Sequence, residues 1–336
     1  MLKPYISRLL HHDDLTEDDC QQAMDLIMAG DATEAQIAGF LIALRMKGET
    51  VPEITGCARS MRNAASGVNV EASNAVDTCG TGGDTSGTFN ISTAAAIVTA
   101  AAGVTVAKHG NRSVSSSSGS ADALQELGVN IEAPVAVVER CVKEANIGFL
   151  FAPLLHKAMK YAIGPRRELG VRTVFNILGP LTNPGGVRRQ LLGLYSRDLV
   201  EKIAGVLRNL GTEKAMVVHS DDGLDELSIC APNTVADLDN GTITMRRVEP
   251  QNLGIEPAQI EDLMVDTPEE SSSVIRSILS GRQGPQRDVV ILNAGAAIHV
   301  GGEAGSLQEG IQTAARVIDE GKAQHTLDQL CQLSQY

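Results

Sequence analysis

The sequence predicts an α/β protein: a small N-terminal helical domain, then a large α/β domain with a mainly parallel central sheet flanked by helices. Two patterns indicate this. In residues 1–70, apolar side chains recur at helical spacing between helix caps and glycines. From residue 71 to residue 336, short apolar strands alternate with helices. Such alternation is typical of a parallel sheet, whose ligands bind at the carboxyl ends of its strands.

The N-terminal region is predicted to contain three helices with clear boundaries. Thr16 caps the first, which runs to Gly30. Thr33 with Gln36 forms the pattern of a capping box for the second, and Pro52 lies in the first turn of the third. Their apolar stripes are too narrow for a large core. We therefore expect these helices to pack on the rest of the chain or on a second copy of it, and we favour a dimer.

The remaining elements follow from apolar runs and turn residues. The Asn-Gly turn at residues 240–241 predicts a hairpin. Residues 171–184 are expected to be helical at first and to end in a turn. We expect strands or short apolar stretches at residues 75–79, 104–107, 149–151, 191–195, 215–219, 234–238 and 242–246. We expect helices at residues 92–102, 120–127, 134–145, 154–161, 199–210, 274–279, 294–300 and 307–335.

Composition and charge exclude several classes of protein. The net charge of −13 argues against non-specific binding to nucleic acid and to anionic membranes, which depends on Lys and Arg. Six cysteines without a Cys-x-x-Cys motif argue against a zinc site and a disulfide framework. The N-terminus has no secretory signal, and the longest weakly polar run, residues 94–107, is too short to span a membrane. We expect a cytoplasmic protein.

Two loops rich in Gly, Ser and Thr are the main functional signal. The first begins with Gly80–Asp84 and leads through Asn90–Thr93 into a helix of small residues. The second runs from Lys108 to Ser116 and leads into a helix at Ser120. Backbone N–H groups at a helix start, beside glycines that allow close approach, bind phosphate well. Two such loops predict a ligand with two phosphate groups.

Each loop can also be interpreted as a structural segment without a ligand. The first loop fails the dinucleotide pattern because Thr85 occupies the third glycine position, and no Gly-Lys-Ser/Thr completes a Walker motif. A glycine-rich turn can also be purely structural. The serine-rich run at residues 113–120 has the composition of a flexible linker, although it is short and ends in a capped helix. Lys108 follows a predicted strand, so we expect it to point into the ligand crevice.

Two further charged pairs can be surface groups or ligand-binding groups. Asp225 and Glu226 close an acidic loop at residues 220–226, and adjacent carboxylates beside a phosphate site are suited to Mg²⁺. Arg166 and Arg167 follow Gly-Pro in a predicted turn and can form a guanidinium fork for a carboxylate. Serine-hydrolase and metalloprotease motifs are absent. His156 and two other histidines lack ligand partners at diagnostic spacing.

Taken together, these motifs resemble the anthranilate phosphoribosyltransferases of tryptophan biosynthesis, and the resemblance runs essentially end to end. Thr85 departs from the glycine often found at that position in the family. The related pyrimidine nucleoside phosphorylases share the general fold but differ after Lys-His. The resemblance implies Mg²⁺, a homodimer through the N-terminal helices, and a helical domain joined by part of residues 160–185. That domain would form one wall of the substrate cleft.

The resemblance also assigns site residues. Those implied to contact phosphoribosyl diphosphate are Gly80, Gly83, Asp84, Thr88, Asn90, Ile91, Ser92, Thr93, Lys108, His109, Gly110, Asn111, Arg112, Ser113, Val114, Ser115, Ser116 and Ser120. Those implied to hold Mg²⁺ are Ser92, Asp225 and Glu226, and those for anthranilate are Gly80, Asn111 and Arg166. Lys108, His109 and Arg166 are the implied catalytic residues.

The implied reaction displaces diphosphate from the anomeric carbon of ribose by the anthranilate amine. Because an aromatic amine is neutral at pH 7, no strong base is needed, which agrees with the lack of a catalytic dyad in the sequence. An anthranilate synthase amidotransferase is a possible partner. The rival predictions are a nucleoside phosphorylase of the same fold and a non-catalytic paralogue that binds nucleic acid.

Overall fold

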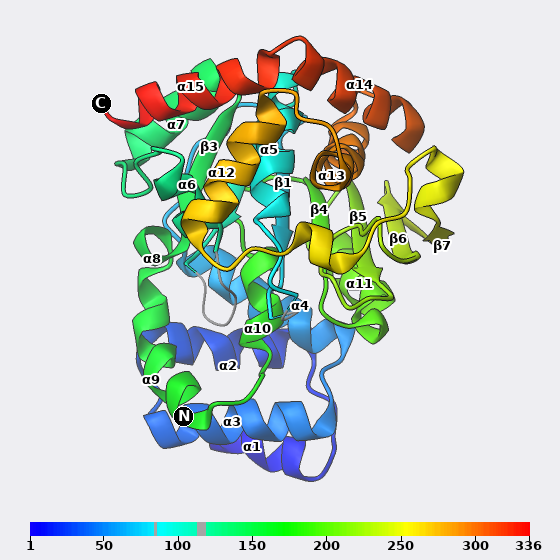
Figure 1. Cartoon of the computed structure of the whole chain (residues 1–336). Coiled ribbons are helices and arrows are strands. Elements are labelled where there is room, and N and C mark those ends of the chain that lie inside the picture. Colours follow the sequence, from blue (N-terminus) through cyan, green and yellow to red (C-terminus); the bar gives the residue numbers. More distant parts are fainter. Residues whose placement is uncertain (84–85, 113–118) are drawn as a thin grey trace.

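The computed structural model describes residues 1–83, 86–112 and 119–336. Within them a seven-stranded sheet has the order β3-β2-β1-β4-β5-β6-β7 (Figure 1). Five strands are parallel: β1 (Val76–Gly80), β2 (Val106–Gly110), β3 (Ile147–Phe151), β4 (Arg189–Gly193) and β5 (Lys214–Ser220). The predicted hairpin, β6 (Asn233–Asp239) and β7 (Thr242–Val248), adds two antiparallel strands at one edge. The predicted mainly parallel sheet is confirmed.

The N-terminal helices are α1 (Lys3–Leu10), α2 (Glu17–Ala29), α3 (Glu34–Lys47) and α4 (Val51–Ala64). Thr16 and Thr50 each complete a capping box. At Thr33 only half of the predicted box forms, because the Gln36 side chain accepts a hydrogen bond from Leu2 N (3.3 Å) instead. α2 and α4 cross so closely at Gly56 that a Cβ there would lie 2.1 Å from Glu17 O.

Helices cover both faces of the sheet (Figure 1). One face carries α5 (Ile91–Ala101), α12 (Pro268–Leu279), α13 (Pro285–Gly301), α14 (Leu307–Asp319) and α15 (Lys322–Ser334), and their apolar side chains share a core with it. The other face carries α11 (Val200–Asn209) and shares a second core with the N-terminal helices. The single helix predicted at residues 307–335 is wrong, because Gly321 adopts φ 71° and divides α14 from α15.

Two further predictions about local structure are wrong. Arg166 and Arg167 lie in α9 (Lys160–Leu169), not in a turn, because Ala162 and Pro165 are buried and the helix continues past the proline to Gly170. Lys108 and His109 belong to β2 itself, where they pair with β3. Polar side chains are tolerated in this buried strand because its backbone is paired with β3 along its length, His109 N donates to Asp77 Oδ1, and Lys108 Nζ finds oxygen partners.

Two helices from the middle of the chain pack on the N-terminal helices. α9 packs on α2 and α3, and α10 (Phe175–Leu178) packs on α4 (Figure 1). The other short elements are α6 (Ser120–Glu126), α7 (Val135–Ala145), α8 (Ala152–Leu155), η1 (Lys157–Met159), η2 (Gly179–Leu181), η3 (Arg197–Leu199), η4 (Pro250–Leu253) and η5 (Ile260–Leu263). Of the helices in the described ranges, none has the length and apolar character required to cross a bilayer.

Candidate active site

Two neighbouring strands end in glycine at the same level of the sheet, and the acidic loop crosses directly over them. Gly80 at the end of β1 is paired in register with Gly193 at the end of β4. A Cβ on Gly193 would lie 1.4 Å from Asp225 O, and a Cβ on Gly80 would lie 2.3 Å from Asp225 Oδ2. Only glycine therefore allows the loop to bring its carboxylates over the first glycine-rich loop.

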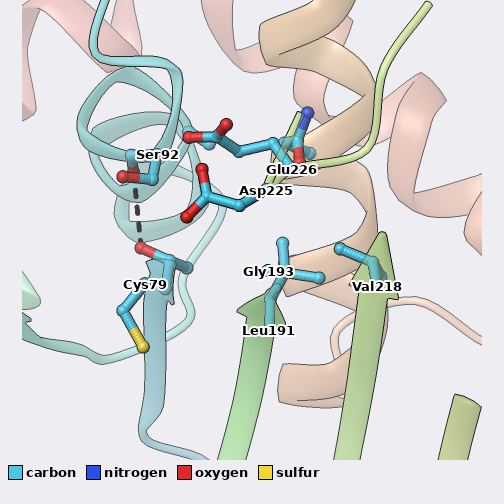
Figure 2. A pocket seen from close by; sticks show the side chains of 10 residues that line it. Cys79, Ser92, Leu191, Gly193, Val218, Asp225 and Glu226 are labelled. Atoms are coloured by element: carbon cyan, nitrogen blue, oxygen red, sulfur yellow. Dashed lines mark hydrogen bonds between the residues drawn. The ribbon is translucent and has the colours of Figure 1, made fainter. Parts of the chain in front are cut away.

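The three predicted metal ligands line one small cavity. Ser92 comes from α5, and Asp225 and Glu226 come from the acidic loop; both carboxylates point toward Ser92 (Figure 2). The cavity has a volume of about 10 Å³, which is enough for one water molecule or a small ion. Asp225 is only 6% exposed, and its Oδ2 accepts a hydrogen bond from Gly82 N (2.6 Å).

This donor set fits Mg²⁺ better than a transition metal. Two carboxylates and one hydroxyl supply hard oxygen ligands, and Mg²⁺ usually takes few protein ligands and keeps positions for water and phosphate. Among the described residues, no group of three or more His, Cys, Asp or Glu side chains is arranged to hold a metal. A closed protein cage of the zinc type is therefore not formed by this part of the chain.

Lys108 lies beside this cavity, because it bonds to two of the residues that line it. Its side chain is 2% exposed, and its Nζ donates hydrogen bonds to Thr78 O (2.6 Å) and Ser92 Oγ (3.1 Å). Burial lowers the pKa of Lys108, and the carboxylate of Asp77 opposes that shift. The lysine therefore brings a positive charge from β2 to the start of α5, next to the hydroxyl of a candidate metal ligand.

The start of α5 is held by Asn90. The Asn90 Oδ1 accepts hydrogen bonds from Thr93 N (3.0 Å) and Ser92 Oγ (3.4 Å), so Asn90 is the cap of the helix. Thr88 precedes it and forms an isolated bridge with Met264. Ile91 and Thr93 have fully buried side chains, so only their backbone atoms are suited to contact a ligand.

The first loop is fastened to the end of β4. Thr81 N donates to Gly193 O (3.0 Å), and Tyr195 N donates to Thr81 Oγ1 (3.1 Å). Arg172 donates to Gly83 O and lies 4.1 Å above the centre of the Tyr195 ring. Arg172 could not be predicted from the sequence, because its contact with a loop 89 positions earlier leaves no local pattern.

The second loop begins where β2 ends. A Cβ on Gly110 would lie 2.2 Å from Ser120 Oγ and 2.7 Å from Phe149 Cε2, so a side chain there would have to displace both. The carbonyl oxygen of Asn111 accepts from Ala121 N (3.2 Å) and Ser120 Oγ (3.4 Å). The Arg112 guanidinium is paired with Asp122 at 2.9 Å. The predicted contacts Asp84, Ser113, Val114, Ser115 and Ser116 lie outside the described residues.

Arg166 offers a half-buried positive charge on α9. Its guanidinium stacks over the Phe175 ring, 5.0 Å from the ring centre, and burial lowers the pKa of Arg166. No hydrogen bond or ion pair with another described residue occupies this guanidinium. The stacking fixes its orientation, so it is suited to receive a carboxylate. No hydrogen bond within the described chain joins it to Gly80 or Asn111.

His109 lies in a buried polar group that sequence analysis identified only in part. His109 N donates to Asp77 Oδ1 (3.1 Å), and its ring centre is 5.0 Å from that of His156. Burial, with His156 beside it, lowers the pKa of His109 to about 3, and burial also lowers the pKa of His156. Both rings are therefore neutral at pH 7. The sequence left His156 without a partner because His109, the ring beside it, is far away in sequence.

Comparison with known proteins covers the whole chain. Residues 3–65 match the model of the helical bundle domain of a glycosyl transferase family, and residues 72–324 match the α/β domain of that family. The anthranilate phosphoribosyltransferase of Petrotoga mobilis is 50% identical over 336 residues, covering 100% of this chain and 98% of the relative. That of Thioalkalivibrio sulfidiphilus is 54% identical over 317 residues, covering 94% of each.

Solved structures give the same result. Anthranilate phosphoribosyltransferase from Thermus thermophilus superimposes with a TM-score of 0.94 at 40% identity, covering 98% of this chain and 99% of the other. The enzyme from Saccharomyces cerevisiae in complex with PRPP and Mg superimposes with a TM-score of 0.89 at 27% identity, covering 99% and 98%.

Proposed function

Because the chain belongs to the anthranilate phosphoribosyltransferase family, we propose that it transfers the phosphoribosyl group of phosphoribosyl diphosphate to the amine of anthranilate in tryptophan biosynthesis. The bond between the anomeric carbon and the diphosphate oxygen breaks, and the oxygen keeps the electron pair. The amine nitrogen bonds to the anomeric carbon and loses a proton to solvent or to the departing diphosphate. The products are N-(5-phosphoribosyl)anthranilate and diphosphate. The relatives favour this reaction over the nucleoside phosphorylase alternative.

The observation that carries the proposal is the convergence of Ser92, Asp225 and Glu226 on one cavity beside the first loop. We assign these three side chains to Mg²⁺. When bound, the ion neutralises charge on the diphosphate and stabilises its departure. The Saccharomyces relative is described in complex with PRPP and Mg, which supports this cofactor. The position of Asp225 depends on Gly80 and Gly193, so both strand ends contribute to the site.

The two loops are assigned to phosphoribosyl diphosphate. We assign Lys108 to the departing diphosphate, because a preorganised donor stabilises developing charge. Of the first loop's backbone N–H groups, those of Thr81 and Gly82 already donate to Gly193 O and Asp225 Oδ2. The residues we assign to this substrate are Gly80, Gly83, Asp84, Thr88, Asn90, Ile91, Ser92, Thr93, Lys108, His109, Gly110, Asn111, Arg112, Ser113, Val114, Ser115, Ser116 and Ser120. In the described structure the Arg112 guanidinium donates to Asp122 and Gln125 (2.9 Å each), so these two bonds compete with its contact to the substrate.

Anthranilate is assigned to Gly80, Asn111 and Arg166, with His109 beside its path. Arg166 supports this because its oriented guanidinium has no other acceptor in the described chain. A forked pair with the anthranilate carboxylate would orient the amine for attack. The attacking amine is already neutral, so the neutral rings of His109 and His156 need not act as strong bases. Catalysis then depends on positioning and on stabilising the leaving group.

We also propose two domains, residues 1–70 and 71–336, with α9 and α10 joining the first, and a homodimer formed through the N-terminal helices. Leu10 in α1 and Met46 in α3 support the dimer, because they are 68% and 77% exposed. Light scattering of the L10E/M46E double variant would test the dimer.

An anthranilate synthase amidotransferase is a candidate partner for co-purification. All six cysteines lie in the described chain and are free thiols, which supports a reducing cytoplasm.

The reaction is tested by following the loss of anthranilate fluorescence with phosphoribosyl diphosphate and Mg²⁺. The proposal expects loss that needs all three components, with release of diphosphate in equal amount. Thymidine with inorganic phosphate serves as the rival substrate pair. Cleavage of thymidine without consumption of anthranilate would assign the chain to the nucleoside phosphorylases. A DNA mobility shift that weakens with salt, with neither reaction, would favour the nucleic-acid-binding alternative.

A further inference from the structure

A segment from the C-terminal half of the chain runs along the connection between the first loop and α5. We call residues 263–271 the strap. Val265 N donates to Gly87 O (2.9 Å), and Phe89 N donates to Leu263 O (3.0 Å). Thr88 forms its bridge with Met264 between these two bonds. The strap then enters α12, which lies beside α5 (Figure 1).

The strap ends at Ser271 in the first turn of α12. Its side chain is fully buried, and its Oγ accepts a hydrogen bond from Asn90 N (2.9 Å). This bond fixes the backbone of the residue that caps α5. The neighbouring Ser272 is also buried, but its Oγ donates to Glu269 O (2.9 Å) within the same helix.

A chain of hydrogen bonds leads from Ser271 to the candidate metal ligand. Asn90, held through its backbone by Ser271, accepts at Oδ1 from Ser92 Oγ (3.4 Å). Ser92 Oγ in turn accepts from Lys108 Nζ (3.1 Å). Loss of the first link would loosen the backbone of Asn90, whose Oδ1 still accepts from Thr93 N, and would let the hydroxyl that faces Asp225 and Glu226 shift.

We propose that Ser271 is a positioning residue for phosphoribosyl diphosphate. It touches neither substrate and acts through Asn90 on the start of α5 and on Ser92. This inference rests on the proposed function, because it assigns that end of α5 to the diphosphate and its Mg²⁺. It adds a residue from α12, outside both glycine-rich loops and the acidic loop, to the residues that determine affinity for this substrate.

The test compares Ser271→Ala with Ser272→Ala as a matched control. Calorimetry measures binding of phosphoribosyl diphosphate with Mg²⁺ in the absence of anthranilate, so the readout does not depend on turnover. Losing one buried hydrogen bond predicts binding about three- to tenfold weaker in Ser271→Ala, with a KM for phosphoribosyl diphosphate raised equally. The KM for anthranilate should stay within about twofold, and Ser272→Ala should bind as the wild type does.

Ser271→Cys keeps the size of the side chain and replaces the oxygen by a weaker acceptor. It should bind between the wild type and the alanine variant, and it carries the test if Ser271→Ala does not fold. Equal binding by the wild type and Ser271→Cys would then overturn the inference. So would equal losses in Ser271→Ala and Ser272→Ala, or a parallel rise in both KM values. A wild-type protein that does not bind phosphoribosyl diphosphate would overturn the proposed function and this inference together.

Discussion

Replacing Gly193 by alanine would test how the acidic loop is positioned. The added Cβ would lie 1.4 Å from the carbonyl oxygen of Asp225, whereas real Cβ atoms essentially never approach within 3.0 Å. Because the neighbouring atoms belong to the backbones of Asp225 and Glu226, no side-chain rotation can relieve the overlap. The strand end and the loop must separate by about 1.6 Å, the difference between these two distances.

That displacement is large compared with the tolerance of a reaction site. A shift of about 1 Å in a positioning element can cost about 100-fold in rate. We therefore expect kcat/KM of Gly193→Ala to fall by at least about 100-fold, or about 2.7 kcal/mol in transition-state stabilisation. The Mg²⁺ concentration for half-maximal activity should rise as well, because Asp225 and Glu226 move away from Ser92.

The assay follows anthranilate fluorescence at saturating phosphoribosyl diphosphate while Mg²⁺ is varied. Gly205→Ala in α11 is the control, because its Cβ would meet Val51 Cγ2 at an ordinary 3.5 Å. Thermal unfolding of both variants separates a displaced loop from a lost fold. If Gly193→Ala keeps wild-type activity and Mg²⁺ dependence, the close packing of Asp225 on the strand ends does not determine the site.

Three other experiments test the assigned roles. Arg166→Ala should raise the KM for anthranilate at least about tenfold, with little change in the KM for phosphoribosyl diphosphate. Arg167 is exposed, so Arg167→Ala should change neither KM. Equal effects of Arg166→Ala on both KM values would refute the assignment of Arg166 to anthranilate. The double variant Asp225→Asn, Glu226→Gln should lose most Mg²⁺-dependent activity, and isothermal titration with Mg²⁺ and phosphoribosyl diphosphate should show weaker binding; wild-type behaviour would refute the metal role. Lys108→Ala should lower kcat at least about tenfold in a folded protein, as judged by thermal unfolding, and an unchanged kcat would show that its charge does not reach the diphosphate.

The two glycine-rich loops could be predicted from the sequence because their signals are local. Glycines, hydroxyl side chains and a helix start follow one another along the chain, and Asn90, at that predicted helix start, caps α5. The family resemblance placed Asp225 at the metal site. The residue pattern alone was also compatible with a solvated surface carboxylate. Its contact with Gly82 spans 143 positions, and only packing decides such a contact.

The errors have the same physical origin. Gly-Pro before Arg166 indicated a turn, but burial of Ala162 and Pro165 stabilises a helix through the proline. The contact of Arg172 with Gly83 and the pairing of His109 with His156 depend on how distant segments fold together. The glycines at the ends of β1 and β4 were the available signal for the position of the acidic loop. Two neighbouring strands that end in glycine leave room for a loop to cross them.

The charge distribution explains how a chain of net charge −13 can take a polyanion. Lys108 and Arg166 bring positive groups to the site, but Asp225 and Glu226 lie beside the proposed diphosphate position and repel it. At contact distance such repulsion is strong in a buried site, where the effective dielectric constant is low. On the proposed reaction, Mg²⁺ is therefore needed for the diphosphate to bind and not only for it to leave. Phosphoribosyl diphosphate should accordingly bind weakly when a chelator removes the ion.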